Sequence, residues 1–139
     1  TSIKPYVSAN DIAQEAVGKM EKIVANYKFS DSKIKDAANS FIDLYRGKTV
    51  RALGHTVGMS VHDTPYAGKT LQPGEIFTIE PEMRIPDEHL GFRLEDMLLI
   101  TSTGYVNMSG FVPIEPGDVE RLMAQPGLSD AALKMSAAK

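Results

Sequence analysis

The 139 residues of this chain suit one domain with a hydrophobic core, and 42% hydrophobic and 24% charged residues are ordinary values for a soluble globular protein. The net charge of -3 argues against binding to nucleic acid or to an anionic membrane, and no apolar run is long enough to span a bilayer. The absence of cysteine excludes disulfides and thiolate chemistry. It leaves the compartment open, with the cytoplasm slightly favoured.

The first third of the sequence predicts two helices. Ser8 is a good N-cap for a helix that ends near Asn26, and Ser30 or Ser32 can cap a second helix that ends at Gly47. Apolar residues recur at helical spacing in both segments and indicate core packing. They are Ile12, Ala16, Met20 and Ile23 in the first helix, and Ile34, Ala38, Phe41, Ile42 and Tyr45 in the second.

Short β-rich runs follow Lys48 and are separated by turns. The runs are TVRAL, LQPGEIFTIEPEMRI, GFRLEDMLLIT and GYVNMS. Pro73-Gly74 predicts a turn, and residues 102–104 predict a hairpin loop, so adjacent strands should pair antiparallel. Residues 116–123 predict a short helix, and residues 129–139 a last helix or a frayed tail.

Two glutamates lie where a carboxylate is costly. In EIFTIEP, the two-residue period of a strand puts Glu80 on the face opposite Phe77. Glu95 precedes the apolar run 97–100, which predicts a strand covered on both faces. A buried carboxylate needs a cation or strong donors. Two explanations stay open: an ion pair with Arg93 or another side chain, or a divalent metal bound by carboxylates and an imidazole.

The stretch GHTVGMSVHDTP holds two of the three histidines, His55 and His62. Its glycines permit close approach of the backbone. A single histidine is more often a hydrogen-bonded structural residue than a ligand, but the pair together with Glu80 and Glu95 favours a metal site. We expect His89, in PDEHLG, to be simply solvated.

Three motifs in this order and spacing, GHTVGMSVHDTP, LQPGEIFTIEP and GFRLEDMLLITSTGY, resemble the second half of the pita-bread metallopeptidases. That family includes methionine aminopeptidases, Xaa-Pro aminopeptidases and prolidases, with creatinase as a metal-free cousin. The RLED motif and His62-Asp63 resemble the Xaa-Pro aminopeptidase and prolidase branch. The resemblance covers residues 1–115 and leaves 116–139 as a partly helical C-terminal extension. It implies an α+β fold, the C-terminal half of a pita-bread fold, with helices packed on a curved antiparallel sheet.

Carried over position by position, the resemblance implies a role for each candidate residue. His55, Glu80 and Glu95 match metal ligands, and Glu95 matches the carboxylate that bridges two ions. Glu80 also matches the group that transfers protons. His62 matches a catalytic histidine that contacts the substrate near the scissile bond, and Arg93 matches an arginine that orients the acidic ligands. The implied cofactors are two divalent ions (Mn, Co or Zn), and the implied substrate is a peptide.

The sequence departs from the family in two respects. Xaa-Pro enzymes often read Glu-Pro-Gly-x-Tyr at this position. This chain has Glu82 in place of the glycine and Arg84 in place of the tyrosine. These residues change the shape and charge of the pocket, which leaves imino-acid specificity open. The two aspartate ligands that the family carries in the first half of its fold have no counterpart here.

We therefore expect the C-terminal fragment of a dinuclear metallopeptidase that is inactive on its own. Metal should be absent or weakly bound, and the fragment should self-associate through surface that the missing N-terminal half would cover. Two alternatives stay open. One is a noncatalytic pita-bread module that binds peptides or proteins, and the other is a metal-free creatinase-like hydrolase.

Overall fold

The computed structural model describes residues 3–47, 53–63 and 70–127. It has an α+β fold, as expected, in which every paired strand runs antiparallel to its neighbour. Contacts divide the chain into two compact units, Thr1–Ser109 and Gly110–Lys139. The expected domain division after residue 115 stays a prediction. The elements in chain order are α1 (Ala9–Asn26), α2 (Ser32–Arg46), β1 (Thr56–Val57), β2 (Ile76–Ile79), β3 (Glu82–Ile85), the 3-10 helix η1 (Pro86–Glu88), β4 (Leu90–Arg93), β5 (Asp96–Ile100), β6 (Tyr105–Asn107) and α3 (Pro116–Met123).

Capping residues set the ends of the first two helices. The Ser8 hydroxyl accepts a hydrogen bond from the Asp11 N–H at 3.0 Å, which confirms the predicted start of α1. The prediction of Ser30 or Ser32 as the cap of α2 was wrong, because Asp31 accepts from the Lys33 N–H at 2.7 Å. An aspartate caps as well as a serine, and its charge also suits the positive end of the helix dipole.

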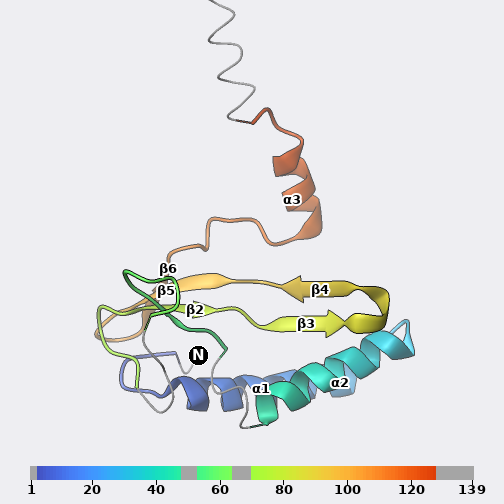
Figure 1. Ribbon diagram of the computed structural model, residues 1–139, viewed down its shortest axis with the longest axis horizontal. Helices are drawn as coiled ribbons and strands as arrows, with labels where there is room; N and C mark the ends of the chain where they lie inside the picture. The colour runs from blue at the N-terminus through green and yellow to red at the C-terminus, as the bar shows by residue number, and fades with distance from the viewer. Residues whose placement is uncertain (1–2, 48–52, 64–69, 128–139) are drawn as a thin grey trace, which may run out of the picture. The chain divides into compact units, whose positions relative to one another are not determined.

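The hydrophobic core of the first unit lies between the two helices and β2. Ile79 packs against both of its clusters, one between α1 and the sheet and one between α1 and α2. Figure 1 shows α1 and α2 running side by side along the strands. Two residues of the predicted stripes, Ile23 and Ile34, are exposed. The buried residues of α1 are Ala9, Ile12, Ala13 and Val17, and Met20 and Val24 further along the helix pack, partly buried, against the same core.

The strands form a four-stranded sheet, in the order β1-β2-β5-β6, and a separate β3-β4 pair. The register does not shift between them, since Ile79 pairs with Asp96 and Glu82 pairs with Arg93. The two ladders therefore belong to one long hairpin whose pairing is interrupted for two residues on each strand. Pro81, which has no N–H to donate, lies in this interruption. Unbroken register places Glu80 directly opposite Glu95.

The predicted turns are confirmed. Gly74 has φ 93°, and the Glu75 N–H donates to the Gln72 carbonyl at 3.1 Å. The β5–β6 hairpin closes through the Thr101 N–H, which donates to the Gly104 carbonyl at 2.9 Å.

Other predictions had different outcomes. One face of the run 97–100 is buried, at Leu98 and Ile100, whereas the other face, at Met97 and Leu99, is only partly covered. In the second unit, α3 spans the predicted residues. The predicted strand at 49–53, apart from Leu53, and the tail 129–139 lie outside the described residues.

In the part of the chain that the structure describes, no helix combines the length and apolarity needed to cross a membrane.

Candidate metal centre

His55, Glu80 and Glu95 converge on one place at the interruption of the hairpin. Each offers one ligand atom, and these atoms all lie within 4.8 Å of one another. An ion about 2.0–2.2 Å from each ligand atom keeps those atoms within about 4.4 Å of one another. A small movement of the three side chains toward one another would therefore suffice to bind one ion. Within residues 3–47, 53–63 and 70–127, no other group of three histidine or acidic side chains is arranged in this way.

The imidazole of His55 is oriented as a metal-ligating histidine would be. Its Nδ1 lies 2.9 Å from the Thr56 carbonyl oxygen, which can only accept, so Nδ1 carries the hydrogen. In the neutral ring the lone pair is then on Nε2, which lies 3.0 Å from Glu80 Oε1. Two acceptors at this distance require a proton or a metal ion between them. The donor set therefore fits a divalent cation.

The two glutamates place negative charge directly across the hairpin. Like charges opposite each other destabilise a strand pair unless a cation lies nearby. Arg93 supplies one, with its guanidinium nitrogens 3.4 Å from Glu80 Oε2 and 3.7 Å from Glu95 Oε2. One guanidinium leaves the pair of carboxylates with a net negative charge. The ion pair with Arg93 and a bound divalent ion are therefore compatible explanations rather than competing ones.

Backbone pairing holds His55 beside Glu80. The Thr78 N–H donates to the His55 carbonyl at 2.7 Å, and the Glu80 N–H donates to the Leu53 carbonyl at 2.8 Å, which continues the β1–β2 register upstream. Gly54 permits this approach, because a Cβ there would lie 1.9 Å from the Thr78 carbonyl oxygen. Gly54, the residue before the first histidine of the motif, thus leaves the space that the Thr78 backbone occupies.

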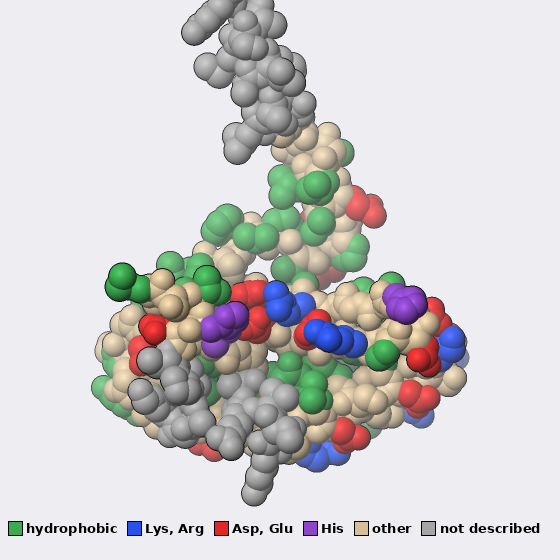
Figure 2. All heavy atoms as spheres, viewed as in Figure 1, with side chains coloured by type: hydrophobic (Ala, Val, Ile, Leu, Met, Phe, Trp, Pro, Cys, Tyr) green, Lys and Arg blue, Asp and Glu red, His purple; other side chains and the backbone are tan. Residues whose placement is uncertain are grey.

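His62 lies next to His55, with ring centroids 4.3 Å apart, so it flanks the convergence point. The segment between the two histidines folds back through the Asp63 N–H, which donates to the Thr56 carbonyl at 3.1 Å. Figure 2 shows histidine side chains beside acidic and basic ones on this face. His89 is exposed after η1.

Sequence reasoning missed Thr78. Its hydroxyl accepts from the His55 N–H at 2.9 Å and lies 3.1 Å from Glu80 Oε1. The available signal was the two-residue period, which puts Thr78 and Glu80 on one face of the strand.

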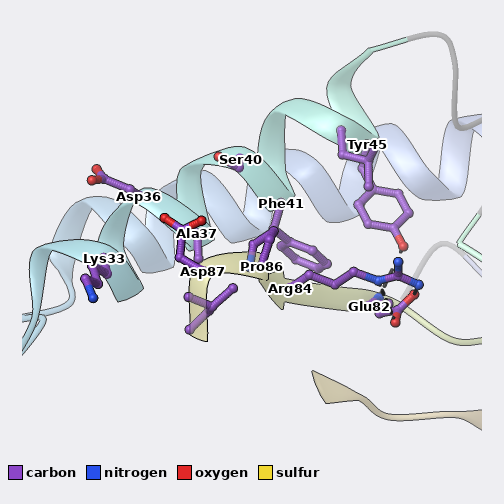
Figure 3. Close-up of a pocket in the computed structure, with 12 residues that line it drawn as sticks. Lys33, Asp36, Ala37, Ser40, Phe41, Tyr45, Glu82, Arg84, Pro86 and Asp87 are labelled. Carbon is purple, nitrogen blue, oxygen red and sulfur yellow. Dashed lines mark hydrogen bonds and ion pairs between the residues drawn. The ribbon is translucent and has the colours of Figure 1, made fainter. Parts of the chain in front are cut away.

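The departures from the family pattern lie beside this site. A groove of about 740 Å³ runs between α2 and the segment from β3 to η1, and Figure 3 shows Phe41 and Tyr45 above Arg84 and Glu82. Arg84 donates twice to the Glu82 carboxylate, at 2.9 Å each, and this hydrogen bonding lowers the pKa of Glu82. Tyr45 and Glu82 also line the smaller hollow that contains His55, His62 and Glu80. The groove therefore adjoins the candidate metal centre.

Comparison with known proteins agrees with this geometry. The sequence profile of Metallopeptidase family M24 matches residues 1–102. The chain belongs to metallopeptidase family M24. Among its relatives, the mitochondrial intermediate cleaving peptidase 55 of Arabidopsis thaliana is 39% identical over 90 residues, which are 58% of this chain and 18% of that protein. Xaa-Pro aminopeptidase 1 of Streptomyces coelicolor is 35% identical over 98 residues, which are 60% of this chain and 20% of that protein.

Solved aminopeptidases P share the fold. Proline aminopeptidase P II from Yersinia pestis superposes with a TM-score of 0.60 at 27% identity, covering 89% of this chain and 31% of that one. Zinc-substituted E. coli aminopeptidase P in complex with product gives a TM-score of 0.60 at 25% identity, covering 91% and 31%. This M24 chain thus spans about a fifth of the length of the two curated relatives and less than a third of these solved chains.

Proposed function

We propose that this chain contributes part of the dinuclear metal centre of a peptidase of the Xaa-Pro aminopeptidase or prolidase type. The observation that carries the proposal is the convergence of one imidazole and two carboxylates, whose ligand atoms all lie within 4.8 Å of one another. The Xaa-Pro aminopeptidases among its relatives support the choice of substrate, a peptide with proline in second position or an Xaa-Pro dipeptide.

In this proposal His55 Nε2 and the carboxylates of Glu80 and Glu95 hold the metal. Two divalent ions (Mn, Co or Zn), when bound, would supply an activated water and polarise the scissile carbonyl. Glu80 accepts the proton of the attacking water and delivers it to the leaving amine. His62 contacts the substrate and donates a hydrogen bond to the developing oxyanion. Arg93 holds both carboxylates in place through its two ion pairs.

We further propose that this chain alone is inactive. Three ligands leave two metal positions incompletely held. Two divalent ions a few Å apart repel each other strongly unless anionic ligands surround them. The missing ligands would come from the longer protein of which this chain would be a part.

The test compares this chain with the longer protein on an Xaa-Pro dipeptide and a proline-second peptide, with added Mn²⁺, Co²⁺ or Zn²⁺ and with a chelator. We expect metal-dependent hydrolysis by the longer protein only. Glu95→Gln should abolish it, whereas the matched control Glu120→Gln, an exposed position on α3, should retain it. Hydrolysis by this chain at the rate of the longer protein would refute the inactivity of the fragment.

The same experiment separates the two alternatives. A longer protein without activity, but with measurable peptide affinity, would favour a noncatalytic binding module. Activity that survives the chelator and Glu95→Gln would favour a metal-free hydrolase of the creatinase kind.

Self-association of the isolated chain stays a prediction. Its motivation is a row of exposed apolar residues, Leu90, Phe92 and Leu94, which alternate along and just beyond β4 and so share one face. Sedimentation should show oligomers of this chain that Phe92→Lys disperses. A monomer at high concentration would contradict it.

A further inference from the structure

The buried hydroxyl of Thr78 contacts two of the three candidate ligands, His55 and Glu80. Thr78 is 2% exposed, and its Oγ1 is 2.9 Å from the His55 backbone nitrogen, 3.2 Å from the His55 carbonyl oxygen and 3.1 Å from Glu80 Oε1. One side chain thus touches the backbone of one ligand and the carboxylate of another. No other hydroxyl in the described part of the chain contacts two of the three candidate ligands in the hydrogen bonds that the structure shows.

The single proton of this hydroxyl has a preferred acceptor. The His55 carbonyl, 3.2 Å from Oγ1, already accepts the Thr78 N–H at 2.7 Å, whereas Glu80 Oε1 lies at 3.1 Å and a carboxylate oxygen is the stronger acceptor. With its proton directed to Glu80, Oγ1 accepts the His55 N–H through a lone pair. Both hydrogen bonds are then satisfied in one arrangement.

This arrangement selects one rotation of the Glu80 carboxylate. Oε1, the oxygen that receives the hydroxyl proton, is also the oxygen 3.0 Å from His55 Nε2. Oε2 is the oxygen that faces Arg93, at 3.4 Å. Thr78 on one side and Arg93 on the other therefore fix which oxygen faces the imidazole. Removal of the hydroxyl frees the carboxylate to rotate about its terminal torsion, which is intrinsically broad.

We infer that Thr78 is a positioning residue for the metal centre, which it serves by orienting Glu80 and fixing the backbone of His55. The inference rests on the proposed function, because it requires that these residues bind metal. Partners that orient metal ligands typically contribute a factor of about 10–100 in metal affinity.

The test measures Mn²⁺ affinity by calorimetry and by the loss of the free-ion electron paramagnetic resonance signal, in the longer protein. Thr78→Val keeps the shape and removes the hydroxyl, and Thr78→Ser keeps the hydroxyl. We expect Thr78→Val to weaken Mn²⁺ binding about 10–100-fold and Thr78→Ser to restore it to within about threefold of wild type. If the valine variant does not fold, Thr78→Ala should show the same weakening.

A matched control separates positioning from general destabilisation. The Thr101 hydroxyl accepts the Gly104 N–H at 3.0 Å in the β5–β6 hairpin and contacts none of the candidate ligands. Thr101→Val should lower the unfolding midpoint in urea and leave Mn²⁺ affinity unchanged. Wild-type affinity in Thr78→Val would overturn this inference alone, and so would a Thr78→Ser variant as weak as Thr78→Val. A wild-type protein that binds no metal would overturn the proposed function and the inference with it.

Discussion

Gly54→Ala should be one of the most damaging small substitutions in this chain. The added Cβ would lie 1.9 Å from the Thr78 carbonyl oxygen, 2.5 Å from its carbonyl carbon and 2.7 Å from its Oγ1, where heavy atoms essentially never approach within 3.0 Å. Two of these atoms are backbone. They cannot move away cheaply, because β2 is paired with β1 on one edge and with β5 on the other.

The expected loss of stability follows from these contacts. The two segments must separate by more than 1 Å to bring the shortest contact from 1.9 Å to 3.0 Å. Overpacking of this kind costs roughly 1–3 kcal/mol, and the hydrogen bonds between His55 and Thr78, at 2.7 and 2.9 Å, add about 1 kcal/mol each when broken. We expect the free energy of unfolding to fall by roughly 3–5 kcal/mol.

Urea unfolding followed by circular dichroism measures this change, and Gly18→Ala is the matched control. Gly18 lies inside α1, where an added Cβ would meet nothing within 4 Å, so alanine should stabilise the chain by about 0.5–1 kcal/mol through helix propensity. If Gly54→Ala unfolded within 1 kcal/mol of the wild type, the close approach of the two segments would not exist, and the placement of His55 beside Glu80 would lose its support.

Two further predictions concern the core and the groove. Phe77→Ala should lower the free energy of unfolding by about 3–5 kcal/mol in urea, because Phe77 is fully buried, whereas Met59→Ala, at a fully exposed position, should change it by less than about 0.5 kcal/mol. Arg84→Ala should raise the pKa of Glu82 toward its ordinary value, as followed by nuclear magnetic resonance titration. Because folding lowers this pKa, the pair stabilises the protein above the ordinary carboxyl pKa and loses that contribution as the pH falls through the lowered value. An unchanged titration of Glu82 would show that Arg84 is not its partner.

The sequence predicted the helix ends that depend on capping by nearby residues. Ser8 and Gly47 mark helix ends because each satisfies backbone groups within a few residues of itself. The cap of α2 was harder to predict, since Ser30, Asp31 and Ser32 are consecutive candidates. Only the backbone conformation at Asp31, with φ -137° and ψ 139°, decides among them.

Tertiary contacts decided what the sequence left open. Ile23 lies on the predicted stripe of α1 but is exposed, because helical periodicity does not show how far along a helix the core extends. The run 97–100 is apolar throughout, yet only Leu98 and Ile100 face the helices. An apolar run shows that both faces can be covered, but it cannot show that the described part of the chain covers them.

The sequence predicted which residues the candidate site would contain, but not the contacts that hold them together. Alternation put Glu80 on the polar face of β2, and the motif resemblance grouped it with His55 and Glu95. The contact between the Thr78 hydroxyl and Glu80 could not be predicted from the sequence, because their distance depends on the rotamers of both side chains.

The site lies where the hairpin loses its own hydrogen bonds, and this location has a physical reason. Pro81 cannot donate to the opposite strand, so pairing stops between Ile79–Asp96 and Glu82–Arg93 while the register continues. A continuous ladder would hold Glu80 and Glu95 face to face at fixed spacing, with their charges in direct opposition. The interruption lets that spacing adjust, and the hydrogen bond from the Glu80 N–H to the Leu53 carbonyl still ties the residue to the segment that carries His55. One edge of the candidate site is therefore tied to the neighbouring segment, while the other lacks ladder hydrogen bonds. An ion bound here would need the three ligand atoms, which lie up to 4.8 Å apart, to move closer together.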